Sequence, residues 1–191
     1  VQQGYLTVND KNEYRLSDSG LEVVKKISRA LDASVDHLDP MPKEGVQKLV
    51  DYLTRLAGAS FIMPEPPAKW LISYKRRNMR PVEGSCLLRY VINYYDQIAA
   101  YRDDMYVATW QAHGVEGHTW ETLDQLVQGD VLTHADLYAK AKGRGVTEEV
   151  HAEDVKELVG RGWAEEGSGV VKATEAGKQV RAEVEAETER L

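Results

Sequence analysis

One short unit occurs twice in this chain of 191 residues, once near each end. The first copy reads "QGYLTVNDKNEYRLSDSGLEVVKKI" at residues 3–27, and the second reads "RGWAEEGSGVVKATEAGKQVRAEVE" at residues 161–185. When Gly20 is placed on Gly177, the apolar positions of the two copies keep one register: Leu16, Val23 and Ile27 fall on Ala173, Val180 and Val184. The shared register predicts that both ends of the chain fold in the same way.

Each copy has the pattern of two short strands followed by a helix. An aromatic residue, Tyr5 or Trp163, opens the first strand, and a polar tip, "NDKN" or "EEGSG", turns the chain. The returning strand leads to Ser17 or Thr174, whose side chains favour the N-cap of a helix. The glycine before each aromatic residue suits the end of a preceding helix. The pattern therefore predicts a helix end, a two-stranded wing and a further helix.

The wing and the helix after it resemble those of winged helix-turn-helix proteins of the MarR-like kind. In those proteins the signature L-T/S-x-x-G follows the second wing strand; residues 16–20 match it, and residues 173–177 match it with Ala in place of Leu. Residues 60–191 also resemble bacterial helix-turn-helix proteins without a defined activity, through "PEPPAKW", "AAYRDDMYVATWQAHGVEGHTWE" and the second wing. The resemblance implies a winged-helix fold and pairing through helices outside the reading unit.

Three further helices are predicted ahead of the second wing, at residues 119–128, 134–142 and 147–161. Thr147 is suited to cap the third of these helices, and its inward face is predicted to carry Val150, Val155, Leu158 and Val159. Helix, helix, helix, wing and helix make a complete winged-helix module. The first copy has only the wing and the last helix, so any reading helix of that module would precede Val1.

The middle of the chain is predicted to be helical. Residues 42–58 have one apolar face, "MPEPPAKW" at 63–70 breaks regular structure with three prolines, and a long helical pattern covers about 83–111. The apolar side of the long pattern consists of Leu87, Leu88, Val91, Ile92, Tyr95 and Ile98. At ~1.5 Å per residue this helix would reach ~40 Å, enough to join two modules or two subunits. We expect it to form a homodimer, unless helix 43–57 already covers its apolar stripe within one chain.

The predicted fold class is therefore mainly α with small β wings. Two winged-helix modules, the first truncated at its N-terminus, are joined by a helical middle with one long helix. The expected domains are the end of the first module at 1–31, the connector at 32–118 and the complete second module at 119–191.

Positive charge is concentrated in one segment of an acidic chain. The formal net charge is −7, from 24 basic and 31 acidic residues, yet residues 65–81 carry five cations and one acid. Such a patch is suited to contact DNA phosphates, or it forms ion pairs with the Asp-containing helix that follows. With the first wing, it supplies the candidate nucleic-acid-binding residues: Lys11, Arg15, Lys75, Arg76, Arg77 and Arg80.

The third helix of the second module has the opposite charge. Residues 147–157 hold five acidic side chains and one lysine, a net charge of −4, and the wing tip adds Glu165 and Glu166. In a helix-turn-helix this helix normally enters the major groove, where phosphates would repel it. We therefore expect the second module not to read DNA.

A group of aromatic residues defines a second candidate site. Five tyrosines lie on or near the long helix, where they either pack as an amphipathic face or line a pocket for a flat effector molecule. The candidate pocket residues are Trp70, Tyr94, Tyr95 and Trp110.

Motifs for catalysis and for metal binding are missing from the sequence. There is no nucleophile elbow, phosphate-binding P-loop or dinucleotide fingerprint, and His113 and His118 lack the Cys partners and spacing of a metal site. We expect no enzyme activity, no cofactor and no metal. The single cysteine, Cys86, and the absence of a long apolar run predict a cytoplasmic protein that does not bind membranes.

Two functions remain open from the sequence. The first is a dimeric, cytoplasmic transcriptional regulator that binds double-stranded DNA through its N-terminal module and uses its acidic C-terminal module for dimer or partner contact. The alternative is a winged-helix protein that binds proteins or small ligands and not DNA.

Overall fold

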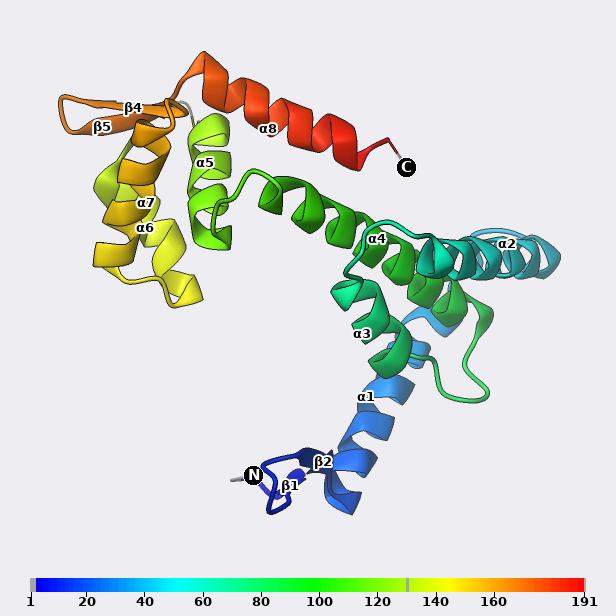
Figure 1. The fold of residues 1–191 in the computed structure, drawn as a ribbon. Helices are drawn as coiled ribbons and strands as arrows, with labels where there is room; N and C mark the ends of the chain where they lie inside the picture. Colours follow the sequence, from blue (N-terminus) through cyan, green and yellow to red (C-terminus); the bar gives the residue numbers. More distant parts are fainter. Residues whose placement is uncertain (1–2, 130, 191) are drawn as a thin grey trace. The chain divides into compact units, whose positions relative to one another are not determined.

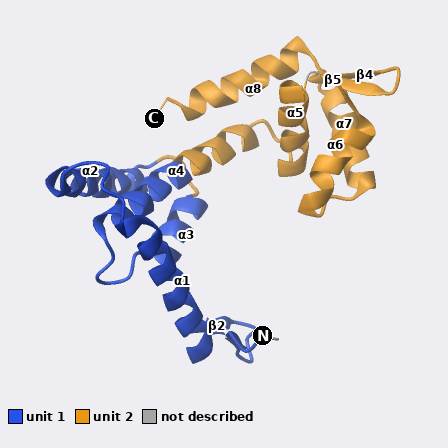
Figure 2. Cartoon of the chain, turned by 180° about the vertical axis from the view of Figure 1, so that it is seen from behind, with its two compact units in different colours: residues 1–64, 69–101 blue, residues 65–68, 102–191 orange. Residues whose placement is uncertain are grey.

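A computed structural model describes residues 3–129 and 131–190. The fold is mainly helical, as predicted, with two small antiparallel sheets in this part of the chain. The chain forms two compact units, residues 1–64 with 69–101 and residues 65–68 with 102–191 (Figure 2). Each unit is described by itself.

The first unit begins with a hairpin and continues with helices (Figure 1). Strands β1 (Leu6–Val8) and β2 (Tyr14–Leu16) pair antiparallel and lead directly into α1 (Asp18–Asp36). Helices α2 (Lys43–Ile62) and α3 (Trp70–Asn78) follow. The long helix α4 (Leu87–Gln111) belongs to this unit as far as Tyr101.

The second unit contains the end of α4 and a complete winged-helix arrangement. Its elements after α4 are α5 (Gly117–Gly129), β3 (Leu132–Thr133), α6 (His134–Ala141), the 3-10 turn η1 (Lys142–Arg144), α7 (Glu148–Gly160), β4 (Ala164–Gly167), β5 (Val170–Ala173) and α8 (Glu175–Thr188). The three strands form one antiparallel sheet in the order β3-β5-β4. This order matches the arrangement predicted for residues 119–191, which is three helices, a two-stranded wing and a further helix.

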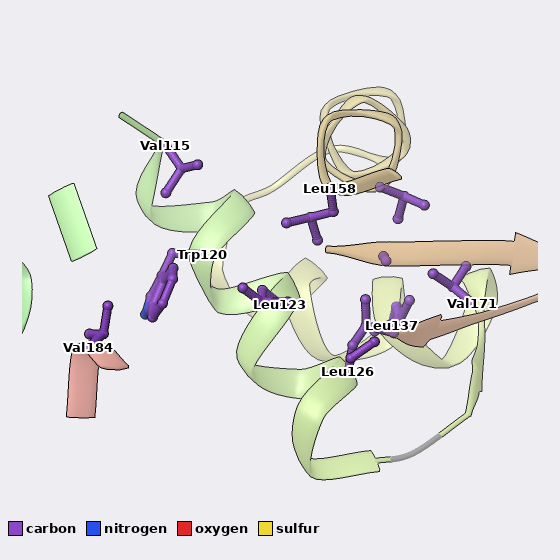
Figure 3. Close-up of a cluster of buried hydrophobic side chains, with 11 residues drawn as sticks. Val115, Trp120, Leu123, Leu126, Leu137, Leu158, Val171 and Val184 are labelled. Atoms are coloured by element: carbon purple, nitrogen blue, oxygen red, sulfur yellow. The ribbon is translucent and has the colours of Figure 1, made fainter. Parts of the chain in front are cut away.

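One apolar core holds the winged-helix arrangement together (Figure 3). Helix α5 lies at its centre and contributes Trp120, Leu123 and Leu126, which contact side chains from the other elements. These partners include Leu137 of α6, Leu158 of α7, Val171 of β5 and Val184 of α8. Burial of these aliphatic and aromatic side chains supplies most of the stability of a unit of this size.

The two repeats fold alike, which confirms the prediction made from their shared register. Ser17 caps α1 by accepting a hydrogen bond from the Gly20 amide at 3.1 Å, and Thr174 caps α8 by accepting one from the Gly177 amide at the same distance. Both hydroxyls also donate back to the carbonyl that precedes the first wing strand. Each cap therefore ties its helix to the start of its own hairpin.

The glycine of the signature is required by a close backbone approach in both repeats. A Cβ atom on Gly20 would lie 2.1 Å from the Tyr5 carbonyl oxygen, and one on Gly177 would lie 2.1 Å from the Trp163 carbonyl oxygen. These carbonyls also accept hydrogen bonds from the backbone amides of Ser17 and Thr174 at 3.0 Å. The helix N-terminus therefore packs directly against the wing backbone, which only glycine allows.

The repeats differ in how much of their apolar face is covered. Ile27 and Leu16 are 56 % and 49 % exposed, whereas their counterparts Val184 and Ala173 are 0 % and 7 % exposed. In the second repeat α5 packs against β5 and α8. In the described part of the chain, the equivalent apolar face of the first repeat is accessible.

Several local predictions for the helices need correction. Helix α4 starts at Leu87 and not near residue 83, because Gly84 adopts a positive φ of 85° in the turn before it. Its buried positions in the first unit include Asn93 and Gln97, while Ile92 and Tyr95 of the predicted apolar side are exposed. In α7, Val159 is also exposed, and His151 and Asp154 are buried instead. Helix α3 and strand β3 were not predicted.

Candidate nucleic-acid interface

The first wing has a hydrogen-bonded polar tip, and its cations are exposed to solvent. The Asn9 side-chain oxygen accepts hydrogen bonds from the backbone amides of Lys11 and Glu13 at 3.0 and 2.9 Å. The Asn9 amide in turn donates to the Glu13 carboxylate at 2.7 Å. These bonds close the turn at residues 9–13, and the exposed Lys11 lies within this turn while the exposed Arg15 lies on β2 after it.

The two wings differ most clearly at one equivalent position. Arg15 in β2 corresponds to Lys172 in β5, and their cross-strand neighbours are Thr7 and Glu165. Lys172 forms an ion pair with Glu165 at 2.8 Å. Neither Arg15 nor Lys11 forms an ion pair within residues 3–129 and 131–190. The first wing therefore has two cations without an ion pair, beside the exposed carboxylates of Asp10 and Glu13, whereas the cation of the second wing at this site is paired.

The surface of the second module that would face a DNA groove is acidic. Glu148, Glu149 and Glu153 of α7 are exposed. The backbone amide of Glu149 itself, and then the Thr147 hydroxyl, lower the pKa of the Glu149 carboxyl. At the wing, Glu166 lies 2.9 Å from His134 Nε2. Carboxylates at these places would repel DNA phosphates.

One acidic residue of α7 belongs to the core and not to this surface. Asp154 is 3 % exposed and accepts a hydrogen bond from the Thr119 hydroxyl at 2.6 Å, with His118 Nδ1 also 2.6 Å away. The exposed charge of α7 is therefore smaller than the sequence count indicated, although it remains negative. Asp154 lies three residues after the buried His151 and four before the buried Leu158, so helical spacing places it on the inward face.

The basic segment of the first unit does not form one uniform patch. Lys75 forms an ion pair with Asp96 of α4 at 2.7 Å, which is the pairing considered as an alternative to phosphate contact. The Arg76 guanidinium lies over the Phe61 ring at 4.6 Å. Arg80 Nε donates to the Arg76 carbonyl at 2.7 Å, and both arginines line a cavity. Arg76 is partly buried, whereas Arg80 and Arg77 are exposed.

The four aromatic residues proposed for a ligand pocket have different surroundings. Trp70 and Tyr95 are 78 % and 65 % exposed on the first unit. Trp110 stacks on Trp120 in the second unit, with ring centroids 6.4 Å apart and planes 10° apart. Tyr94 is the member of the set that lines the cavity with Arg76 and Arg80.

Two negative observations apply to the described residues. They contain no group of three or more His, Cys, Asp or Glu side chains arranged to hold a metal ion. None of their helices combines the length and the apolarity that crossing a membrane requires.

The order of helices and strands in the second unit, with its three-stranded sheet and wing, defines a winged helix-turn-helix protein. Comparison with known proteins agrees with this class: residues 100–191 match a helix-turn-helix family. Among solved structures, the chain is similar to a MarR family protein of Mycobacterium tuberculosis, Rv2887, at 22 % identity and a TM-score of 0.39, over 53 % of this chain and 73 % of that one. No curated protein matches the chain significantly.

Proposed function

We propose that this protein is a DNA-binding transcriptional regulator whose first wing contacts the DNA backbone. The helix-turn-helix fold is the type used by many such regulators. The observation that carries the proposal is the contrast between the wings: Arg15 is unpaired where Lys172 is neutralised by Glu165.

Contact through the first wing is favoured by its two cations without ion pairs and by its hydrogen-bonded turn. Lys11 and Arg15 are exposed, and the Asn9-centred bonds stabilise the turn at residues 9–13 that carries Lys11. A preformed turn loses little conformational entropy when it binds. Cations in this arrangement contact phosphates, which position a protein on DNA without specifying a sequence.

The second module serves a different role in this proposal. Its α7 exposes Glu148, Glu149 and Glu153 against Lys156, and the wing cation Lys172 is paired, so this module contacts a second subunit or another protein instead of DNA. Dimerisation would use the apolar face of α4. Ile92 and Tyr95 of this face are exposed, while its other residues are partly buried. We infer no enzyme activity for this protein.

The proposal is tested by DNA affinity at several salt concentrations. A fluorescein-labelled random duplex is titrated with the wild type, with Lys11→Gln/Arg15→Gln and with Lys172→Gln. Loss of two phosphate contacts should weaken binding and reduce the slope of log K against log salt by about 1.8, at ~0.9 per contact.

Lys172→Gln is the matched control, because it removes a cation from the equivalent position of the second wing. Its affinity and salt slope should equal those of the wild type. If the wild type does not bind duplex at low salt, or if both variants weaken binding equally, the first wing is not the contact surface. Of these two results, only the absence of duplex binding by the wild type would support the alternative function, a winged-helix module without DNA binding.

A further inference from the structure

We propose that a cavity in the first compact unit binds a small organic anion that carries a carboxylate or a phosphate group. The cavity has a volume of about 320 Å³ and lies among α2, α3, α4 and the segment after α3. Its polar lining includes Arg76, Arg80, Tyr90, Asn93, Tyr94 and Gln97. The inference does not depend on DNA binding.

The charge of the cavity is positive and uncompensated. Two guanidinium groups line it, and no Asp or Glu does. Among the described residues, neither Arg76 nor Arg80 forms an ion pair, and the nearby Asp96 is held by Lys75 at 2.7 Å. Arg76 contacts the Phe61 ring and Arg80 donates to one carbonyl of α3, so most guanidinium N–H groups remain available. Two such groups at one concave site favour an anion.

The floor of the cavity is polar and fixed. Asn93 and Gln97 are both buried, although neither belongs to the apolar side predicted for this helix. Gln97 Nε2 donates to Asn93 Oδ1 at 2.8 Å, and Asn93 Nδ2 donates to the Met79 carbonyl. This chain of bonds holds the segment after α3 against α4. A buried amide pair that is held in place can bind a polar ligand without reorganisation.

The lining indicates the class of ligand. An arginine fork binds carboxylate and phosphate groups through paired hydrogen bonds, and the two tyrosines add apolar surface and hydroxyl groups. The volume equals that of roughly ten water molecules at ~30 Å³ each, which suits a molecule with one ring or a short chain. The phosphate backbone of duplex DNA is disfavoured as the ligand of this cavity. The Asn93–Gln97 amide floor is buried, and a double helix cannot enter a cavity of this size.

The test measures binding of defined probes by isothermal titration calorimetry. The probes are benzoate, phenyl phosphate and inorganic phosphate, and benzamide serves as an uncharged analogue of benzoate. The variants are Arg76→Gln, Arg80→Gln and the double variant, with Arg77→Gln as the control on the same helix. Circular dichroism melting of each variant shows whether the unit remains folded, and Arg76→Lys replaces Arg76→Gln if it does not.

We expect benzoate or phenyl phosphate to bind the wild type and Arg77→Gln equally. Each cavity substitution should weaken binding about tenfold to a hundredfold, because it removes a charge-assisted hydrogen bond. The preferred probe distinguishes a carboxylate ligand from a phosphate ester, and binding of inorganic phosphate alone would identify free phosphate.

Three results would overturn the inference. Benzamide binding as tightly as benzoate would show that charge is not recognised. Equal binding to the wild type and the folded double variant would place the anion elsewhere. Absence of probe binding together with weaker duplex affinity in the double variant would assign these arginines to DNA.

Discussion

Replacing Gly177 with alanine should destabilise the second unit, although alanine is the better helix former. Gly177 lies in the first turn of α8, and its Cβ position is 2.1 Å from the Trp163 carbonyl oxygen. Real Cβ atoms almost never approach a neighbour more closely than 3.0 Å, so the carbonyl must move by at least about 0.9 Å, the difference between 3.0 and 2.1 Å.

The expected magnitude follows from three opposing effects. Overpacking of this kind costs ~1–3 kcal/mol. Movement of the Trp163 carbonyl also weakens its 3.0 Å hydrogen bond from the Thr174 amide, which contributes ~1 kcal/mol. The higher helix propensity of alanine returns ~1 kcal/mol. The sum is a loss of about 2 kcal/mol, and for a unit of this size each kcal/mol lowers Tm by ~4–8 °C.

Tryptophan fluorescence during thermal denaturation measures this loss in the second unit, which contains Trp110, Trp120 and Trp163. The control is Gly160→Ala, because Gly160 ends α7 and an added Cβ would meet nothing within 4 Å. The control should be neutral or slightly stabilising. A Gly177→Ala protein at least as stable as the wild type would refute the argument that the close approach requires glycine.

Three further perturbations test the core, the helix α4 and a buried histidine. Leu123→Ala should lower the free energy of unfolding by ~2–5 kcal/mol in urea titrations, because Leu123 is fully buried; a smaller loss would contradict its central place. Ile92→Glu should convert dimers to folded monomers in light scattering, since Ile92 is exposed in each chain; folded dimers would exclude this face. Burial lowers the pKa of His151 below its ordinary 6.5, so the unfolded chain binds a proton first and stability is lost as pH falls below about 6.5. Urea midpoints at pH 5.5 and 7.5 should show this loss in the wild type and a smaller one in His151→Leu.

Much of the fold was predictable because local sequence signals and the burial of apolar residues indicate the same helices and strands. The N-caps Ser17 and Thr174, the polar turns and the apolar register of the repeats are all short-range features, and each has the structural role that was expected. The prolines at 64, 66 and 67 likewise fall between α2 and α3. Features of this kind depend on residues within one or two turns, so the sequence shows them directly.

Burial within single helices was harder to predict, because it depends on what packs against each face. Asn93 and Gln97 are buried in α4 since they hydrogen-bond to each other and to the segment after α3, which hydrophobic periodicity does not report. Asp154 is buried for a similar reason, with partners in α5. Strand β3 has only two residues, too short for an alternating pattern.

The candidate sites were predictable in composition and not in grouping. The sequence singled out Arg76, Arg80 and Tyr94, but it assigned the arginines to DNA and the tyrosine to an aromatic pocket. The structure places all three around one cavity, because α3 and α4 pack together in the first unit. Sequence spacing cannot report this grouping, since Arg76 and Tyr94 lie on different helices.

The central claim is that the first wing contacts DNA and the second does not, and lysine footprinting tests it most directly. The protein is acetylated briefly with and without saturating duplex, and the modification of each lysine is measured by mass spectrometry. Lys11 should become protected by the duplex, while Lys172 of the second wing and Lys156 of α7 should react equally in both samples. Protection of Lys172 or Lys156, with Lys11 unchanged, would contradict the claim.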